Sequence, residues 1–277
     1  MSGTPLPNPV PTAESGPALL KDATWFDSSW PFMSSFLFPI FCLLPFFLDK
    51  SPRRALQNPY VLGWLVVAAY CSHQMEEHAY DMRGWRYAFV PSFNHGFGAF
   101  AFKECERLGH TLCPLDPRIT TYVNVILVWV GFVLTMLWAH WFKGPYAYAG
   151  LCNWGMSVVN AAGGHLLPWI LQGYNPGAFQ SLFMFGFGIY AITRCGPRFA
   201  GMCIFNGLVL HILTFAVGVN LVLKADFPEE VMGVLTILCS WPIPLAIARI
   251  AAPREYTKLA EDDEEEEEED EDAEESP

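Results

Sequence analysis

The sequence predicts an all-α membrane protein, a polytopic bundle of about seven transmembrane helices. Hydrophobic residues make up 52% of the 277 residues and charged residues only 16%, whereas soluble domains carry about 25% charged residues. Apolar segments close to the roughly 20 residues that a helix needs to cross a bilayer recur along the chain. The net charge of −12 does not contradict this class, because half of the 28 acidic residues lie between Glu261 and Glu275.

Seven apolar segments are candidate spans, and six spans is the alternative count. They cover residues 32–48, 59–80, 119–142, 146–171, 178–194, 199–223 and 231–250. The first segment is the weakest, because Pro39 and Pro45 remove helical hydrogen bonds. We expect it to be kinked or only partly inserted. The connections after the third, fourth and fifth segments are short, which predicts antiparallel neighbouring helices.

These segments form one transmembrane domain, residues 23–258, with a different kind of chain on either side. Residues 1–22 are rich in Pro, Ser and Gly and predict a flexible N-terminal arm, without the basic start and early apolar core of a secretory signal. Residues 259–277 are mostly acidic, and such a run repels itself and predicts a disordered tail. The expected partner is the lipid bilayer. Nucleic acid is not expected, since no basic stripe is present.

Basic residues near the short connections gather on one side of the predicted bundle, which places the C-terminal tail in the cytosol. They are Lys50, Arg53, Arg54, Lys143, Arg194, Arg198, Arg249, Arg254 and Lys258. The long connection between the second and third segments then lies outside the cell or in a lumen. A disulfide between Cys105 and Cys113 could form there, whereas free thiols are expected if the topology is inverted. The endoplasmic reticulum is one candidate membrane.

The second segment carries the most informative polar residues, close to its end. His73, Glu76 and Glu77 are three and four positions apart, so on an α-helix they form a stripe along one face. Ionisable groups inside a bilayer cost at least roughly 2.5–3.5 kcal/mol each on insertion scales, so they normally face the bundle interior and mark a functional site. A helix end at the headgroups is the alternative. His78 lies five positions after His73 and is not expected to join the stripe.

The fourth segment carries a second polar pair, Asn160 and His165. These residues are five positions apart, about 140° round an ideal helix, so they share a face only if the two glycines between them bend or bulge the helix. His73 and His165 each lie six or seven residues before the same side of the bundle, about 10 Å deep. We therefore expect His165 to meet the stripe. His211, in the sixth segment, is predicted to be a core histidine with its hydrogen bonds satisfied.

The order of these motifs resembles a known family. His73-Gln-Met-Glu76-Glu77, then Asn160 and His165, then Tyr174-Asn-Pro-Gly177 and an apolar helix are similar to the motifs of membrane proteins named for a His-x-x-Glu-Glu (HXXEE) motif. The resemblance covers about residues 61–192, roughly half of the chain. It implies a multispanning membrane fold and an enzymatic site, without specifying a reaction. From their conformational preferences alone, residues 174–177 predict a turn between two helices.

Two chemistries fit the candidate catalytic residues His73, Glu76, Glu77, Asn160 and His165. In the first, both histidines and one or both glutamates bind a divalent metal such as zinc or iron. In the second, no metal is present, and a carboxylic acid kept protonated by desolvation donates a proton during isomerisation or cyclisation. Either chemistry suggests an enzyme that acts on a lipid or isoprenoid-type apolar substrate. A transporter or a non-catalytic membrane binding protein is the alternative, because ionisable groups also line ion pathways.

Overall fold

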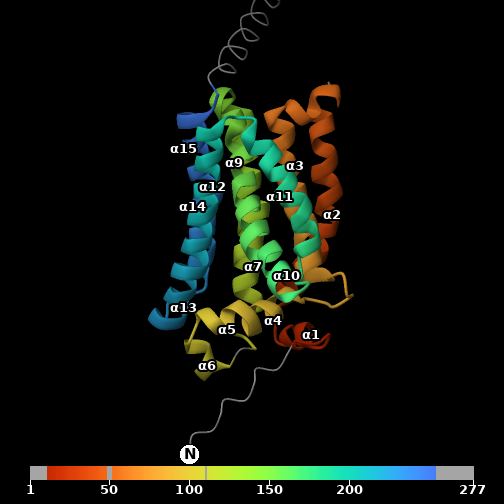
Figure 1. Cartoon of the computed structure of the whole chain (residues 1–277), viewed down its shortest axis with the longest axis vertical. Helices are drawn as coiled ribbons and strands as arrows, with labels where there is room; N and C mark the ends of the chain where they lie inside the picture. Colours follow the sequence, from red (N-terminus) through yellow and green to blue (C-terminus); the bar gives the residue numbers. More distant parts are fainter. Residues whose placement is uncertain (1–10, 49–51, 110, 254–277) are drawn as a thin grey trace, which may run out of the picture.

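The computed structural model describes residues 11–48, 52–109 and 111–253, and the chain forms a bundle of long helices (Figure 1). The predicted acidic tail and the first ten residues of the predicted arm lie outside the described residues. The long helical runs are α2 (Trp25–Leu48), α3 with η2 (Pro59–Gln74, Met75–Ala79), α7 with η4 and α8 (Pro117–Val125, Ile126–Phe132, Val133–Phe142), α9 with η6 and α10 (Ala149–Val159, Asn160–Leu166, Leu167–Gln172), α11 (Ala178–Thr193), α12 with η7 and α13 (Pro197–His211, Ile212–Gly218, Val219–Ala225), and α14 with α15 (Glu230–Ser240, Pro242–Ala251).

The membrane class of the fold is confirmed, because four of these runs are long and apolar enough to cross a bilayer. They are Trp25–Phe47, Pro117–Phe142, Pro197–Ala225 and Glu230–Ala251, and α11 is a shorter apolar helix. The runs that contain α3 and α9 are not among the four. Both carry the polar residues singled out in the sequence, which lower their hydropathy. The count of seven spans therefore stays a prediction.

The first long helix differs from its prediction. It begins at Trp25, seven residues earlier than the apolar pattern indicates, and it is continuous to Leu48 although Pro31, Pro39 and Pro45 lie inside it. Prolines are tolerated in membrane helices where neighbouring groups restore the freed hydrogen bonds. This helix packs along α3, and its buried Ser34 donates a hydrogen bond to Gln74 Oε1 (3.0 Å).

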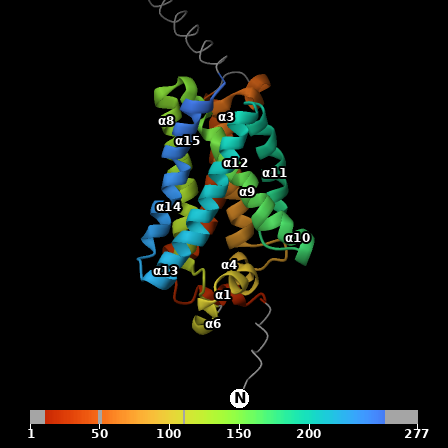
Figure 2. The ribbon, with the colours of Figure 1, turned by 60° about the vertical axis from the view of Figure 1, so that its left-hand side comes forward.

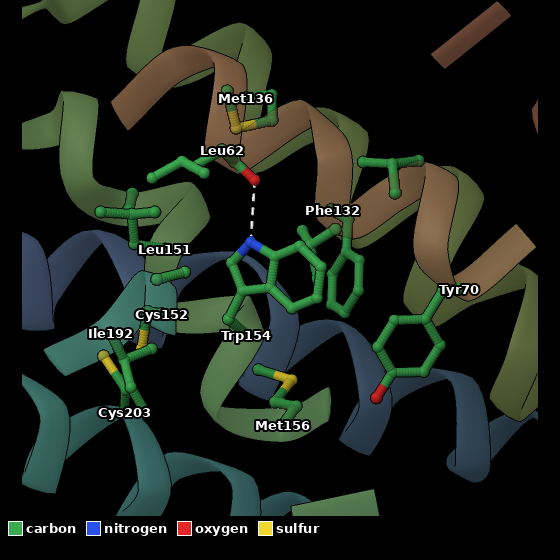
Figure 3. Close-up of a cluster of buried hydrophobic side chains, with 14 of the residues drawn as sticks. Leu62, Tyr70, Phe132, Met136, Leu151, Cys152, Trp154, Met156, Ile192 and Cys203 are labelled. Carbon is green, nitrogen blue, oxygen red and sulfur yellow. Dashed lines mark hydrogen bonds between the residues drawn. The ribbon is translucent and has the colours of Figure 1, made fainter. Parts of the chain in front are cut away.

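The interior of the bundle is held by close contact between α3 and α9. Trp154 Nε1 donates a hydrogen bond to the carbonyl of Leu62 (2.8 Å), and the buried side chains around this pair are drawn in Figure 3. A Cβ on Gly63 would lie 3.2 Å from Gly150 Cα, and a Cβ on Gly150 would lie 2.7 Å from Gly63 Cα. Small residues therefore let two backbones approach here, as is common between membrane helices.

Short elements cover one end of the bundle, the end at which α10 and α13 lie (Figures 1 and 2). They are α1 (Ser15–Leu19), α4 (Phe89–Phe93), η3 (Asn94–Gly98), α5 (Ala99–Ala101) and α6 (Glu104–Leu108). Helix α1 lies within the predicted arm, and its Leu19 is buried. Cys105 and Cys113 form a disulfide with Cα atoms 5.4 Å apart, so of the two outcomes considered for this pair, bridged or free thiols, the structure shows the bridge.

Candidate functional site

The stripe on the second segment lies where α3 changes from α to π geometry. In η2 the backbone N–H of Tyr80 donates to the carbonyl of Met75 (3.0 Å), five residues earlier. A π-turn brings residues five apart onto nearly the same face. Glu77 Oε2 lies 3.4 Å from His73 Nε2, as expected four positions apart, and also 3.4 Å from His78 Nε2. The expectation that His78 stays away from the stripe is wrong, because it assumed α geometry.

The second polar pair is brought together in the same way. Residues Asn160–Leu166 form the π-helix η6, which supplies the bulge that the two glycines permit. His165 Nε2 lies 3.2 Å from Glu77 Oε1. One ligand atom from each of His73, Glu77 and His165 lies within 4.8 Å of the others, and the three side chains are at most 6% exposed. The structure therefore joins α3 and α9 at one buried cluster, His73–Glu77–His165.

The imidazole of His165 is oriented by Asn175, in the turn before α11. The side-chain NH2 of Asn175 donates to the carbonyl of His165 (2.8 Å), so its Oδ1 is free to accept from His165 Nδ1 (2.9 Å). With Nδ1 as the donor, Nε2 of the neutral ring carries a lone pair. This Nε2 is buried, faces Glu77 and has no hydrogen-bond partner among the described residues.

Asn160 extends the cluster to a third helical run. Its Nδ2 lies 3.1 Å from His73 Nε2, and its Oδ1 lies 3.3 Å from His211 Nε2. His211 Nδ1 in turn lies 2.7 Å from the carbonyl of Gly207. Both ring nitrogens of His211 thus lie within hydrogen-bond distance of a partner, and one of these contacts leads to the site.

Glu76 points away from the cluster and accepts hydrogen bonds at the start of α11. Its Oε1 accepts hydrogen bonds from the hydroxyl of Tyr174 (2.8 Å) and the backbone N–H of Phe179 (3.1 Å). Its Oε2 accepts from the backbone N–H of Gln180 (2.7 Å). A carboxylate at a helix N-terminus satisfies free N–H groups and the helix dipole. The structure thus separates Glu76 from the other predicted metal ligands.

Gly177 forms one wall of the cluster. A Cβ at this position would lie 2.8 Å from each of Glu77 Cγ, His165 Cε1 and His73 Cε1. The φ of Gly177 is +90°, a value that L-residues rarely adopt. The turn expected from residues 174–177 therefore does more than connect two helices. It lets backbone lie directly against three site side chains.

Aromatic rings pack against two of the histidines of the site, His78 and His165. The ring of Phe89 lies 5.5 Å from that of His165 and 5.7 Å from that of His78. Trp30 and Tyr87 lie 5.1 and 5.3 Å from the His78 ring. These contacts place the site in an apolar enclosure at the covered end of the bundle.

Apolar helices around a buried cluster of histidine and glutamate define a helical protein of the membrane class with a buried polar site. The model of the family described as "protein of unknown function with HXXEE motif" matches residues 64–191, so this part of the chain is similar to that family. The matched region contains the cluster, Asn160 and Gly177. No curated protein and no solved structure matches the chain.

Proposed function

We propose that this chain is an integral membrane enzyme that acts on a lipid or isoprenoid-type apolar substrate, with a divalent metal held by His73, Glu77 and His165. The observation that carries the proposal is the buried Nε2 of His165, which faces Glu77 without a hydrogen bond. A bare nitrogen 3.2 Å from a carboxylate oxygen is unfavourable unless a proton or a cation lies between them.

The donor set fits a transition metal. Two imidazoles and one carboxylate are ligands that zinc and iron accept, and they leave positions open for water or substrate. The Asn175–His165 hydrogen bond resembles the outer contacts that fix ligating histidines in metal sites. When bound, such a metal supplies Lewis acidity and an activated water. Glu77 and the two histidines would hold it, while Asn160 lies beside His73 and can orient a polar group of the substrate.

A metal-free acid–base enzyme is the second candidate. Glu77 lies within 3.4 Å of the three imidazoles of His73, His78 and His165. Such contacts permit a proton to be accepted and returned at one place, as isomerisation or cyclisation requires. In the acid–base mechanism His78 would accept and donate protons, in addition to packing against the aromatic rings beside the site.

The surroundings of the cluster support an apolar substrate that arrives from the bilayer. Gly163 and Gly164 on η6 are exposed, and the space beside Gly163 is open. This surface faces outward from the bundle two positions before His165. We also propose seven spans with a cytosolic C-terminal tail. The Cys105–Cys113 disulfide supports an oxidising compartment on the side of the site.

Metal analysis of purified protein tests this function. We expect about one zinc or iron per chain in the parent and loss of most of it in His73→Ala and Glu77→Gln. His140→Ala is the matched control, because His140 contacts Trp64 and Tyr60 away from the cluster. Parent protein without metal whose lipid-converting activity is still lost in Glu77→Gln supports the acid–base candidate. Retained activity in Glu77→Gln rejects both enzymatic versions, and flux across sealed vesicles without lipid conversion supports a transporter.

A further inference from the structure

The side chain of Asn160 lies between two imidazoles that belong to different helical runs. Its Nδ2 lies 3.1 Å from His73 Nε2, and its Oδ1 lies 3.3 Å from His211 Nε2. The oxygen and the NH2 of an amide have nearly the same size, but the oxygen accepts hydrogen bonds and the NH2 donates them. The partners of the amide therefore determine which end faces the cluster, and His211 is one of these partners.

The contacts of His211 place its ring proton on Nδ1. Nδ1 lies 2.7 Å from the carbonyl oxygen of Gly207, one helical turn earlier in α12. A carbonyl oxygen only accepts, so a contact this short requires an N–H on Nδ1. Close packing of α12 on α9 holds this carbonyl in place, because a Cβ on Gly207 would lie 2.7 Å from the carbonyl oxygen of Gly155. The backbone contact thus sets the tautomer of His211.

The position of His211 favours a neutral ring. It lies 14 residues from each end of the run Pro197–Ala225, which is apolar enough to cross a bilayer. A charged imidazole at the centre of such a span is costly unless an opposite charge contacts it. Among the residues that the structure describes, His211 forms no ion pair, and the Glu77 carboxylate contacts three other imidazoles. A neutral ring with its proton on Nδ1 has a lone pair on Nε2.

This lone pair decides the orientation of Asn160. With Oδ1 beside it, two acceptors would lie 3.3 Å apart without a proton between them. A half turn of the amide about its Cβ–Cγ bond places the NH2 beside His211 as a donor. The amide oxygen then lies beside His73 Nε2, where it accepts a hydrogen bond from a ring N–H. Each contact from the Gly207 carbonyl to His73 now joins a donor to an acceptor.

We propose that His211 is a positioning residue, which holds the amide oxygen of Asn160 toward His73. The cluster then has an acceptor at this position in place of an NH2 group. An amide oxygen carries partial negative charge, so it favours a proton on His73 or a cation in the cluster, whereas an NH2 would oppose a cation. The effect on a cation rests on the function proposed above, but the orientation of the amide requires no metal. His211 thus acts on the site through Asn160.

Nitrogen-15 NMR of histidine-labelled protein in phosphatidylcholine bilayers tests the tautomer of His211. The protein is treated with a chelator, and the spectrum at neutral pH separates ring nitrogens that carry a proton from those that carry a lone pair. The His211 signals are those that disappear in His211→Phe or, should that variant not fold, in His211→Gln. We expect a proton on Nδ1 and none on Nε2. A proton on Nε2, in a neutral or a charged ring, would overturn the proposal.

Magnetisation transfer from amide protons tests the contact with Asn160. The NH2 signals of Asn160 are those that disappear in Asn160→Ala, and we expect their protons to transfer magnetisation to His211 Nε2. The NH2 of Asn175 donates to the carbonyl of His165 (2.8 Å), so it is the matched control and should show no transfer to His211. Transfer from Asn160 to His73 Nε2 alone would show the opposite orientation and overturn the proposal.

Zinc affinity separates a positioning role of His211 from a structural one. His211→Phe should weaken zinc binding about tenfold, as is typical of residues that orient a metal site. In the Asn160→Asp background both ends of the side chain are oxygens, so His211→Phe should change affinity by no more than about twofold there. His140→Phe is the matched control, because His140 contacts Trp64 away from the cluster, and it should leave affinity unchanged.

Equal losses of affinity in the two backgrounds would make His211 a structural residue and overturn the proposal. Parent protein that binds no zinc would reject the metal-dependent function. The orientation of Asn160 would then be decided by the NMR spectra, which are recorded without metal.

Discussion

Glu76→Gln tests whether the two adjacent glutamates have different roles. Glu76 accepts three hydrogen bonds at the start of α11, whereas Glu77 faces three imidazoles. A glutamine keeps the size of Glu76, but its amide NH2 cannot accept. In the best orientation the amide oxygen accepts hydrogen bonds from Tyr174 and Phe179, and the amide NH2 faces the backbone N–H of Gln180. One buried donor is then unpaired.

The magnitude follows from these contacts. Loss of a hydrogen bond to a charged acceptor costs about 1.5–3 kcal/mol, and loss of negative charge at a helix N-terminus costs about 0.3–1 kcal/mol more. We expect the free energy of unfolding to fall by about 2–4 kcal/mol. At about 2–4 °C per kcal/mol for a chain of this size, the melting temperature should drop by roughly 4–16 °C. Metal content, measured below that temperature, should not change.

Thermal unfolding in detergent, followed by tryptophan fluorescence, measures this effect. Glu106→Gln on the exposed face of α6 is the matched control and should melt within about 1 °C of the parent, because surface substitutions change stability by at most about 0.5 kcal/mol. A Glu76→Gln variant that keeps the parent's melting temperature but loses its metal would refute the helix-capping role and make Glu76 a ligand.

Three further substitutions test the roles of Gly177, Asn175 and Glu229. Gly177→Ala should weaken metal affinity more than tenfold, because its Cβ would press on all three proposed ligands. Gly173→Ala also places a side chain at positive φ (+91°) but meets open space, and it should leave affinity unchanged in a chelator competition. Asn175→Ala frees the imidazole that it orients and should lower metal affinity 10–100-fold, and an unchanged affinity would remove this contact from the site. Burial and the adjacent Asp116 raise the pKa of Glu229 to about 7 from its ordinary 4.5. The folded state therefore holds this proton more tightly, so stability should decline as pH rises from 4.5 through 7. Glu229→Gln should flatten that part of the profile in urea titrations, and a slope equal to the parent's would contradict the assignment.

The level at which the site residues meet could be predicted from the sequence. The depth of a residue within the bundle depends only on the rise per residue and on where its apolar segment ends. Both can be read from the sequence for His73 and His165. The pairing of His73 with Glu77 follows equally from their spacing of four. Helical periodicity alone was sufficient for these features.

Local helical geometry and distant partners could not be predicted. The side chain of His78 contacts Glu77 because η2 is a π-helix. No residue type in this segment predicts the change from α to π geometry. Glu76 and Glu77 are equivalent in the sequence. Their difference comes from the N-terminus of α11, about 100 positions away. The contact of His211 with Asn160 likewise depends on how α12 packs on α9.

The π-helical segments have a mechanical consequence. The runs that meet at the site change geometry there, through η2, η6 and η7, whereas α3 and α9 interlock further along at Gly63 and Gly150. π-Turns are rare and occur frequently at functional sites, and a bilayer whose thickness does not match the bundle strains its helices. We expect strain on these three π-helical segments to change the distances between the side chains of His73, Glu77 and His165.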